Sequence, residues 1–160
     1  MGHSSTRMAD DPQPHSIYAG QFRHSIDEKN RITIPSRWRR ADGGAEDFIL
    51  LPEPRGEFLL VMPPAQFAKT SAEAANDPSL PKAERRVFSR QLHARAQHGA
   101  SDKQGRLVLP EEICRQLELK GEVALVGGEG RFEIWNLKSW TKAHQEETPT
   151  YQHVAHAIGL

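Results

Sequence analysis

Two short segments of this chain place an arginine four residues after an aspartate, a spacing suited to contacting nucleic acid. The segments run from Asp27 to Pro35 and from Asp102 to Pro110, and they share the aspartate, the arginine, two aliphatic residues and the proline. An arginine that begins a strand carries a planar fork of N–H donors, which fits guanine edges or phosphate. An aspartate across the turn could cap backbone N–H groups and orient that guanidinium. We therefore interpret the segments as two DNA-contacting hairpin turns, with these central residues: Asp27, Arg31, Asp102 and Arg106.

Four more basic side chains lie near these turns and are candidate phosphate contacts by location and charge. Lys29 and Lys103 fall within the turns, whereas Arg23 and His98 precede them. Phosphate contacts position a protein on DNA without reading its sequence. The chain has no net charge, with 21 basic and 21 acidic residues, yet basic residues gather around both segments and acids dominate after Glu111. This segregation indicates a basic face, as a DNA partner requires.

Length and composition exclude several classes of protein. A chain of 160 residues with 37% hydrophobic residues fits one domain, or two subdomains that share a core. It is too short for a large multidomain enzyme, and no apolar run reaches the roughly 18 residues of a membrane-spanning helix. Residues 1–16 lack the apolar region of a secretory signal, so we expect a cytoplasmic protein.

No set of residues predicts catalysis or a bound metal. The single cysteine, Cys114, shares an apolar helix face with Ile113 and Leu117, which predicts core packing and not a nucleophile. The histidines lack the spacing of a metal site, and the glycines at 127–130 lack the lysine of a phosphate-binding loop. We therefore expect no enzymatic activity, no cofactor, no metal and no small-molecule substrate.

The two turns must be positioned by two similar halves of the chain. In each copy the arginine begins a short alternating strand, which predicts that Ile32 and Ile34, like Leu107 and Leu109, face inward. Two apolar runs separated by a turn follow each copy, and helices are predicted over 64–75, 81–97, 111–119 and from 137 to about 145. The predicted organisation is a disordered N-terminal extension that partly resembles an expression tag (1–16), a first repeat (17–75), a connecting helix (76–97), a second repeat (98–145) and a C-terminal tail (146–160).

The doubled segment, together with the run from Arg131 to Trp135, resembles the MraZ family of bacterial transcriptional regulators, which are built from two SpoVT/AbrB-type domains. The resemblance covers about Ile17 to Lys142, and the family pattern D-x-x-x-R is intact in both copies. One departure is Asn30, where glycine is usual, although asparagine also adopts the left-handed conformation. The resemblance implies a mixed α/β, mainly β fold: an interlocked β-barrel of AbrB/MraZ type with double-split β-α-β topology, made of two pseudo-symmetric halves plus short helices.

The same resemblance implies a function and two partners. Similar proteins bind double-stranded DNA at promoter direct repeats upstream of the division and cell-wall gene cluster. They act usually as repressors, and their targets usually include their own gene, which implies a location at the nucleoid. They assemble into ring-shaped homo-oligomers, for which the family suggests an octamer or a dodecamer. A ring would line up several hairpins, so that weak single contacts gain strength through effective concentration.

Two alternatives remain open. The chain could be a protein-interaction module, such as an AbrB-like antitoxin or an assembly scaffold, in which the hairpins serve packing. Its distinguishing feature would be a free C-terminal segment, and residues 146–160 are a short, weakly apolar example. An arginine run in the connecting helix could form a second DNA surface, although such helix faces are usually solvated or paired with acids. The run consists of Arg85, Arg86, Arg90 and Arg95.

Overall fold

Turn residues and prolines divide residues 17–160 into eight short strands and a few helices. The computed structural model describes residues 17–160, and the predicted extension at residues 1–16 lies outside this range. The strands are β1 (Gln21–Ser25), β2 (Arg31–Thr33), β3 (Glu46–Pro52), β4 (Phe58–Met62), β5 (Gln97–Ser101), β6 (Arg106–Val108), β7 (Glu122–Val126) and β8 (Phe132–Asn136). The helices are the 3₁₀-helix η1 (Ser36–Trp38) and α2 (Pro64–Ala75), α3 (Lys82–Arg95), α4 (Glu111–Gln116) and α5 (Leu137–Ala157).

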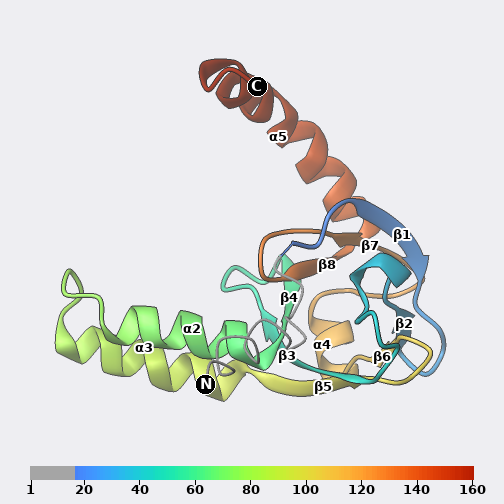
Figure 1. Ribbon diagram of the computed structural model, residues 1–160, viewed down its shortest axis with the longest axis horizontal. Helices are drawn as coiled ribbons and strands as arrows, with labels where there is room; N and C mark the ends of the chain where they lie inside the picture. Colours follow the sequence, from blue (N-terminus) through green and yellow to red (C-terminus); the bar gives the residue numbers. More distant parts are fainter. Residues whose placement is uncertain (1–16) are drawn as a thin grey trace, which may run out of the picture.

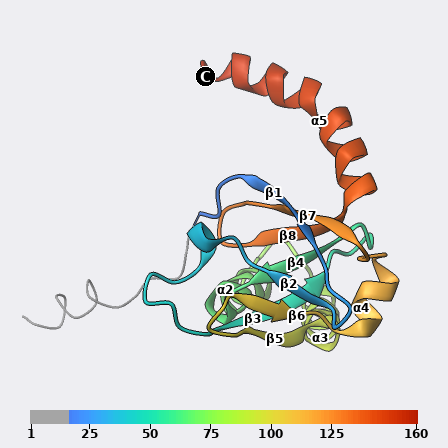
Figure 2. The same ribbon diagram turned by 90° about the vertical axis from the view of Figure 1, so that its right-hand side faces the viewer.

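All eight strands form one antiparallel sheet, in the order β1-β7-β8-β4-β3-β5-β6-β2. Because the turn at 27–30 joins β1 to β2, the two ends of this order meet and the sheet curls into a nearly closed barrel (Figures 1 and 2). The halves exchange strands: β1 pairs with β7 of the second half, and β5 pairs with β3 of the first. The interlocked, pseudo-symmetric barrel that the resemblance implies is confirmed.

The barrel interior is filled by alternate residues of the strands, as the period of two requires. Ile32, Ile34, Leu107 and Leu109 are each at most 1% exposed, which confirms the predicted inward faces of both copies. Trp38 of η1 packs edge-on against Phe22 and at a tilt against Phe132 inside this core. Residues from both halves therefore share one core, and neither half could bury its apolar face alone.

Helices α2 and α3 form a hairpin that covers the outside of β3 and β4. The outward residues of these strands pack against Phe67 of α2 and Leu92 of α3. The opposite faces of the same strands line the barrel, so β3 and β4 are apolar on both sides. Beyond this contact the hairpin projects from the barrel (Figure 1). Helix α2 matches the predicted range 64–75, whereas α3 ends at Arg95, two residues short of the predicted range 81–97, because Gln97 begins β5.

The last two helices differ in length from the prediction. Helix α4 ends at Gln116 because Glu118 adopts a positive φ of 54°, which stops the helix short of residue 119. Helix α5 was expected to end near Gln145, which is wrong: it continues to Ala157, with Pro149 inside it. Its first turns dock on the barrel, where the Trp140 indole N–H donates to the Gln21 side chain at 2.8 Å. The remainder extends away from the barrel in Figures 1 and 2, and none of the helices described is long and apolar enough to cross a membrane.

Candidate nucleic-acid interface

The first turn, residues 27–31, is organised around the Asp27 carboxylate. One oxygen, Oδ1, accepts the backbone N–H of Lys29 at 2.9 Å and that of Arg31 at 2.8 Å. The other oxygen, Oδ2, accepts the Nε–H of the Arg31 side chain at 2.7 Å. The Arg31 backbone N–H, and after it the guanidinium, lower the pKa of Asp27 from its ordinary value. The carboxylate thus stays charged at neutral pH and fixes both the loop and the guanidinium.

The second turn, residues 102–106, repeats this geometry. Asp102 Oδ1 accepts from the backbone N–H groups of Gln104 and Arg106, each at 2.9 Å. Its Oδ2 accepts the Nε–H of Arg106 at 2.8 Å. Hydrogen bonding, led by the Arg106 backbone N–H, lowers the pKa of this carboxyl too. The two copies of the sequence pattern therefore build the same structural unit.

Each arginine uses only its Nε atom within its turn. Within residues 17–160, no hydrogen-bond or ion-pair partner is found for the terminal Nη atoms of Arg31 or Arg106. The Arg31 and Arg106 side chains are partly exposed, at 31% and 38%. The Nη groups form the end of a planar fork that can donate to two acceptors at once. An arginine held by an aspartate and open at its end is suited to a guanine edge or a phosphate.

The two turns lie at opposite ends of one two-stranded ribbon, β2 with β6. In this ribbon Arg31 is opposite Val108, Ile32 opposite Leu107 and Thr33 opposite Arg106. Backbone bonds flank it symmetrically, from Leu109 N–H to Asn30 O and from Ile34 N–H to Gly105 O, each 2.8 Å. A pseudo-two-fold axis therefore passes between Ile32 and Leu107 and relates the two arginines. A two-stranded ribbon of this kind fits the major groove of DNA.

The two turns are not identical in charge. The first contains Glu28 and Lys29, whereas the second has Lys103 and Gln104 at the matching positions. Arg39 adds a further cation to the second turn, since its Nη1 donates to the Gln104 carbonyl at 3.0 Å. Gly105 adopts a φ of 79° and the matching Asn30 a φ of 59°, so both turns require a residue type that tolerates the left-handed conformation. Sequence reasoning missed Arg39 because its contact joins residues far apart in the chain.

Arg23 and His98, the candidate phosphate contacts outside the turns, occupy matching positions on β1 and β5. His98 is exposed on β5, opposite Ile49 of β3. Arg23 is exposed too, but its guanidinium donates to Glu122 Oε1 at 3.0 to 3.2 Å. An exposed ion pair of this kind contributes little free energy, so Arg23 can exchange Glu122 for another partner. Arg23 is therefore a less available cation than Lys29 and Lys103, which are both exposed within the turns.

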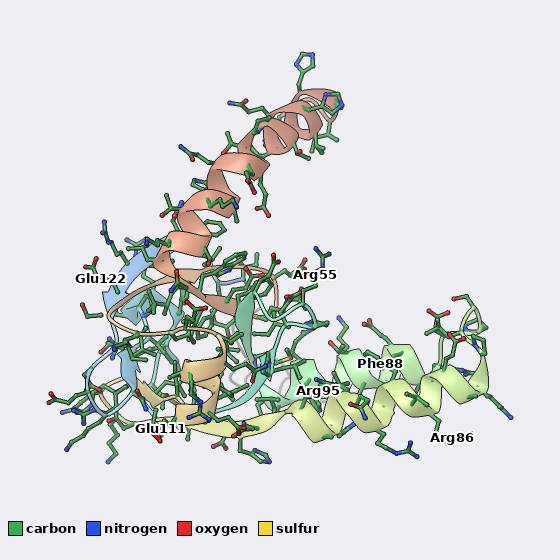
Figure 3. All side chains as sticks on the ribbon, turned by 180° about the vertical axis from the view of Figure 1, so that it is seen from behind. Arg55, Arg86, Phe88, Arg95, Glu111 and Glu122 are labelled. Carbon is green, nitrogen blue, oxygen red and sulfur yellow. The ribbon has the colours of Figure 1, made fainter. Side chains whose placement is uncertain are left out.

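The arginine run lies on α3, on the hairpin and not on the ribbon. Arg85 Nη1 donates to the Ala75 carbonyl at 3.0 Å, and Arg95 donates to Gln91 at 3.0 to 3.2 Å. Arg86 and Arg95 lie along α3 in Figure 3, with Phe88 between them in sequence. The structure therefore separates this basic surface from the two turns.

The residues for which the sequence predicts no catalytic or phosphate-binding role have structural roles instead. Cys114 is buried in the core, and burial raises the pKa of its thiol, which confirms the packing role. The glycines at 127–130 join β7 to β8, as the sequence predicts for a hairpin turn. Within residues 17–160, no cluster of three or more His, Cys, Asp or Glu side chains could hold a metal ion.

Strand exchange between two similar halves, with an aspartate-arginine turn in each, defines a pseudo-dimeric barrel of two SpoVT/AbrB-type domains. A family model described as "MraZ protein, putative antitoxin-like" matches the chain twice, over residues 17–90 and 92–160. The chain belongs to the MraZ family. The second match extends beyond Lys142, where the resemblance noted from the sequence ends, and it includes the whole of α5.

Curated relatives carry the same family name. A protein of Finegoldia magna named "Transcriptional regulator MraZ" is 30% identical over 142 residues, which cover 89% of this chain and 96% of that protein. A protein of the same name from Pediococcus pentosaceus is 32% identical over 139 residues, with 87% and 94% covered. A third, from Natranaerobius thermophilus, is 29% identical over 142 residues, with 89% and 96% covered. The family is one of transcriptional regulators and not of enzymes.

Proposed function

We propose that this protein is a DNA-binding transcriptional regulator that contacts DNA through its two aspartate-arginine turns. The observation that carries the proposal is the pair of guanidiniums, each held at Nε by an aspartate and open at its Nη atoms. Both lie on one exposed ribbon of a size that fits the major groove. The names of the relatives support the same function.

The residues of the turns have different roles in binding DNA. Arg31 and Arg106 donate to base edges, and Asp27 and Asp102 hold them in position. The exposed lysines of the turns, together with His98 and Arg23, bind phosphates and set the register of the chain on the duplex. Arg23 contributes least to phosphate binding, because its guanidinium forms an ion pair with Glu122 at 3.0 Å.

The targets are direct repeats upstream of the division and cell-wall gene cluster, including the promoter of this protein's own gene. The protein represses by occupying these repeats, and it acts in the cytoplasm at the nucleoid. The family resemblance supports this part of the proposal. A bound ribbon in the major groove would compete for promoter DNA without any catalytic step.

The active form is a ring-shaped homo-oligomer, an octamer or a dodecamer. Exposed apolar surface away from the turns supports self-association, since such patches often mark protein interfaces. Tyr151 and Val154 of α5, together with Ile158 at its C-cap, are 65%, 48% and 73% exposed, and their spacing puts them on one helix face. On α3, Val87 and Phe88 are 52% and 43% exposed. A ring would place several ribbons on successive repeats and raise their combined affinity.

The exposed apolar face of α5 also favours the second candidate function, a protein-interaction module such as an antitoxin. In that case the C-terminal helix would bind a different protein, and the turns would not touch DNA. The family description as antitoxin-like is in keeping with this alternative. DNA binding by the turns distinguishes the two functions.

Fluorescence anisotropy tests the proposal on a duplex from upstream of the protein's own gene and on a scrambled duplex, at several salt concentrations. We expect Arg31→Ala with Arg106→Ala to abolish the preference for the upstream duplex and leave the fold intact. The matched control, Arg55→Ala with Arg131→Ala, removes two exposed arginines at the ends of the strands remote from the turns. Figure 3 shows Arg55 across the barrel from Glu122, which pairs with the strand that enters the first turn. Unchanged preference in the first variant would refute the proposal.

A further inference from the structure

We propose that Thr33 and Val108 are specificity-determining residues that fix the direction in which the chain lies on DNA. This inference rests on the proposed function, because it assigns a role on the same ribbon. Neither residue belongs to the aspartate-arginine pattern, and neither contributes to the core. Their role follows from where the ribbon places them.

Both side chains stand on the outward face of the ribbon, beside the arginines. Val108 is 53% exposed, and Thr33 is also exposed, whereas the intervening Ile32 and Leu107 are buried. Directly opposite residues of an antiparallel pair point to the same side, so Val108 stands beside Arg31, and Thr33 beside Arg106.

The backbone hydrogen bonds bring these pairs especially close. The bonds from Leu109 to Asn30 and from Ile34 to Gly105 mark hydrogen-bonded positions at both ends of the ribbon. Hydrogen-bonded and non-hydrogen-bonded pairs alternate along an antiparallel ladder. Arg31 with Val108, and Thr33 with Arg106, therefore occupy non-hydrogen-bonded pairs, where opposite side chains approach most closely. A base that contacts the guanidinium therefore also lies within reach of the side chain opposite that arginine.

The chemistry of the two neighbours differs. Val108 offers only methyl groups, which favour the C5-methyl group of thymine and offer no hydrogen bond to other base edges. Thr33 has a similar shape but carries a hydroxyl, which can donate to or accept from a base edge. The base step beside Arg31 is therefore read by apolar contact, and the step beside Arg106 by a polar one.

This difference breaks the two-fold symmetry of the reading surface. The outward face of the ribbon consists of four side chains, and the two arginines are equivalent. If Thr33 and Val108 were also equivalent, the four outward side chains of the ribbon would read the bases of a duplex equally well in either direction. The two turns also differ in charge, at Glu28 against Lys103 and at Lys29 against Gln104. Charge differences of this kind act on the phosphates, and phosphate contacts carry little sequence information. A contact of this kind would let the chain distinguish the two directions of a duplex from base contacts alone.

The experiment selects duplexes from a randomised pool with the full chain and with three variants. Thr33→Val and Val108→Thr each make the outward face symmetric, and the double variant exchanges the two residues. We expect the wild type to select an asymmetric motif, the single variants to select symmetric motifs, and the double variant to recover an asymmetric one. Valine and threonine have nearly the same shape at these exposed positions, and thermal unfolding of each variant confirms the fold.

A second measurement isolates the methyl contact. In the selected motif, each thymine in turn is replaced by deoxyuridine, which removes only the C5-methyl group. One replacement should weaken wild-type binding about fourfold, the factor expected for one buried methyl-sized group. The same replacement should change the affinity of Val108→Ser by less than about 1.5-fold.

The outcomes separate this inference from the proposed function. If the wild type selects no motif, both fail. If the wild type selects a symmetric motif, or if all variants select the same asymmetric motif, the inference fails and the proposed function stands. If the substitutions weaken binding to all sequences equally, Val108 merely supports the Arg31 side chain, and the inference is again overturned.

Discussion

Replacing both turn arginines by lysine separates reading of the sequence from attraction to phosphate. Arg31→Lys with Arg106→Lys keeps both positive charges on the ribbon. In the wild-type chain, each arginine donates from Nε to an aspartate, at 2.7 and 2.8 Å, and keeps its two Nη atoms available for DNA. A lysine ends in a single nitrogen, so it cannot hold the aspartate and present a fork at the same time. We expect the double variant to bind DNA but to lose its sequence preference.

The expected loss of sequence specificity follows from the pair of outward Nη atoms that each arginine presents. A bidentate arginine contact with guanine contributes about 1 to 3 kcal/mol of discrimination. Two such contacts per chain correspond to about 2 to 6 kcal/mol, or a loss of roughly 30-fold to more than 10⁴-fold in the specificity ratio. Binding to a scrambled duplex should change by less than about threefold, because the charge is conserved.

The assay is competition anisotropy, with a labelled upstream duplex displaced by unlabelled upstream or scrambled duplex. The matched control is Arg55→Lys with Arg131→Lys, remote from the turns, which should keep the wild-type ratio. A specificity ratio in the ribbon variant within threefold of the wild type would refute the reasoning. It would mean that the arginines act as point charges and that the aspartates orient nothing of consequence.

Three further predictions concern charge, pH and assembly. Lys29→Gln with Lys103→Gln should reduce the slope of log affinity against log salt by about 1.8 per chain, and an unchanged slope would exclude both lysines as phosphate contacts. Because hydrogen bonding lowers the pKa of Asp27 and Asp102 in the folded state, their stabilising contribution is complete above the ordinary value of 3.8 and is lost as the pH falls through the lowered values. Carbon NMR of the carboxyl groups should give midpoints below 3.8 for both, and midpoints at or above it would contradict the turn geometry. Val154→Asp should shift sedimentation towards the monomer without loss of helix, whereas unchanged sedimentation would exclude α5 from self-association.

The local parts of the fold could be predicted because their causes are local. The alternation of Ile32 with its polar neighbours predicts the short strand and its buried face, which the structure confirms at 1% exposure. The positive φ expected at Asn30 and Gly105 is found at 59° and 79°. The aspartate contacts in the turns follow equally from spacing, since the carboxylate, loop and arginine all lie within five residues.

Pairings between distant strands could not be derived from local pattern. The exchange of β1 and β5 between the halves depends on which strand buries which face, and the apolar runs alone allow several arrangements. The resemblance supplied this topology. The ion pair of Arg23 with Glu122 and the contact of Arg39 with the second turn could not be predicted for the same reason, because both join residues far apart in the sequence.

The length of α5 was missed for a different reason. Pro149 suggested the end of a helix, because proline lacks the N–H that an interior position donates. The helix nevertheless passes through it. The spacing of Tyr151, Val154 and Ile158 already carries a helical period, and giving that period more weight than the single proline would have predicted the helix.

A structure of the full chain bound to the duplex it selects from a randomised pool tests the central claim most directly. The account predicts that the β2–β6 ribbon lies in the major groove, with Nη atoms of Arg31 and Arg106 within hydrogen-bond distance of base edges. It also predicts that both Nε atoms remain on Asp27 and Asp102. A complex in which the arginines of α3 hold the DNA while both turns face solvent would contradict the account.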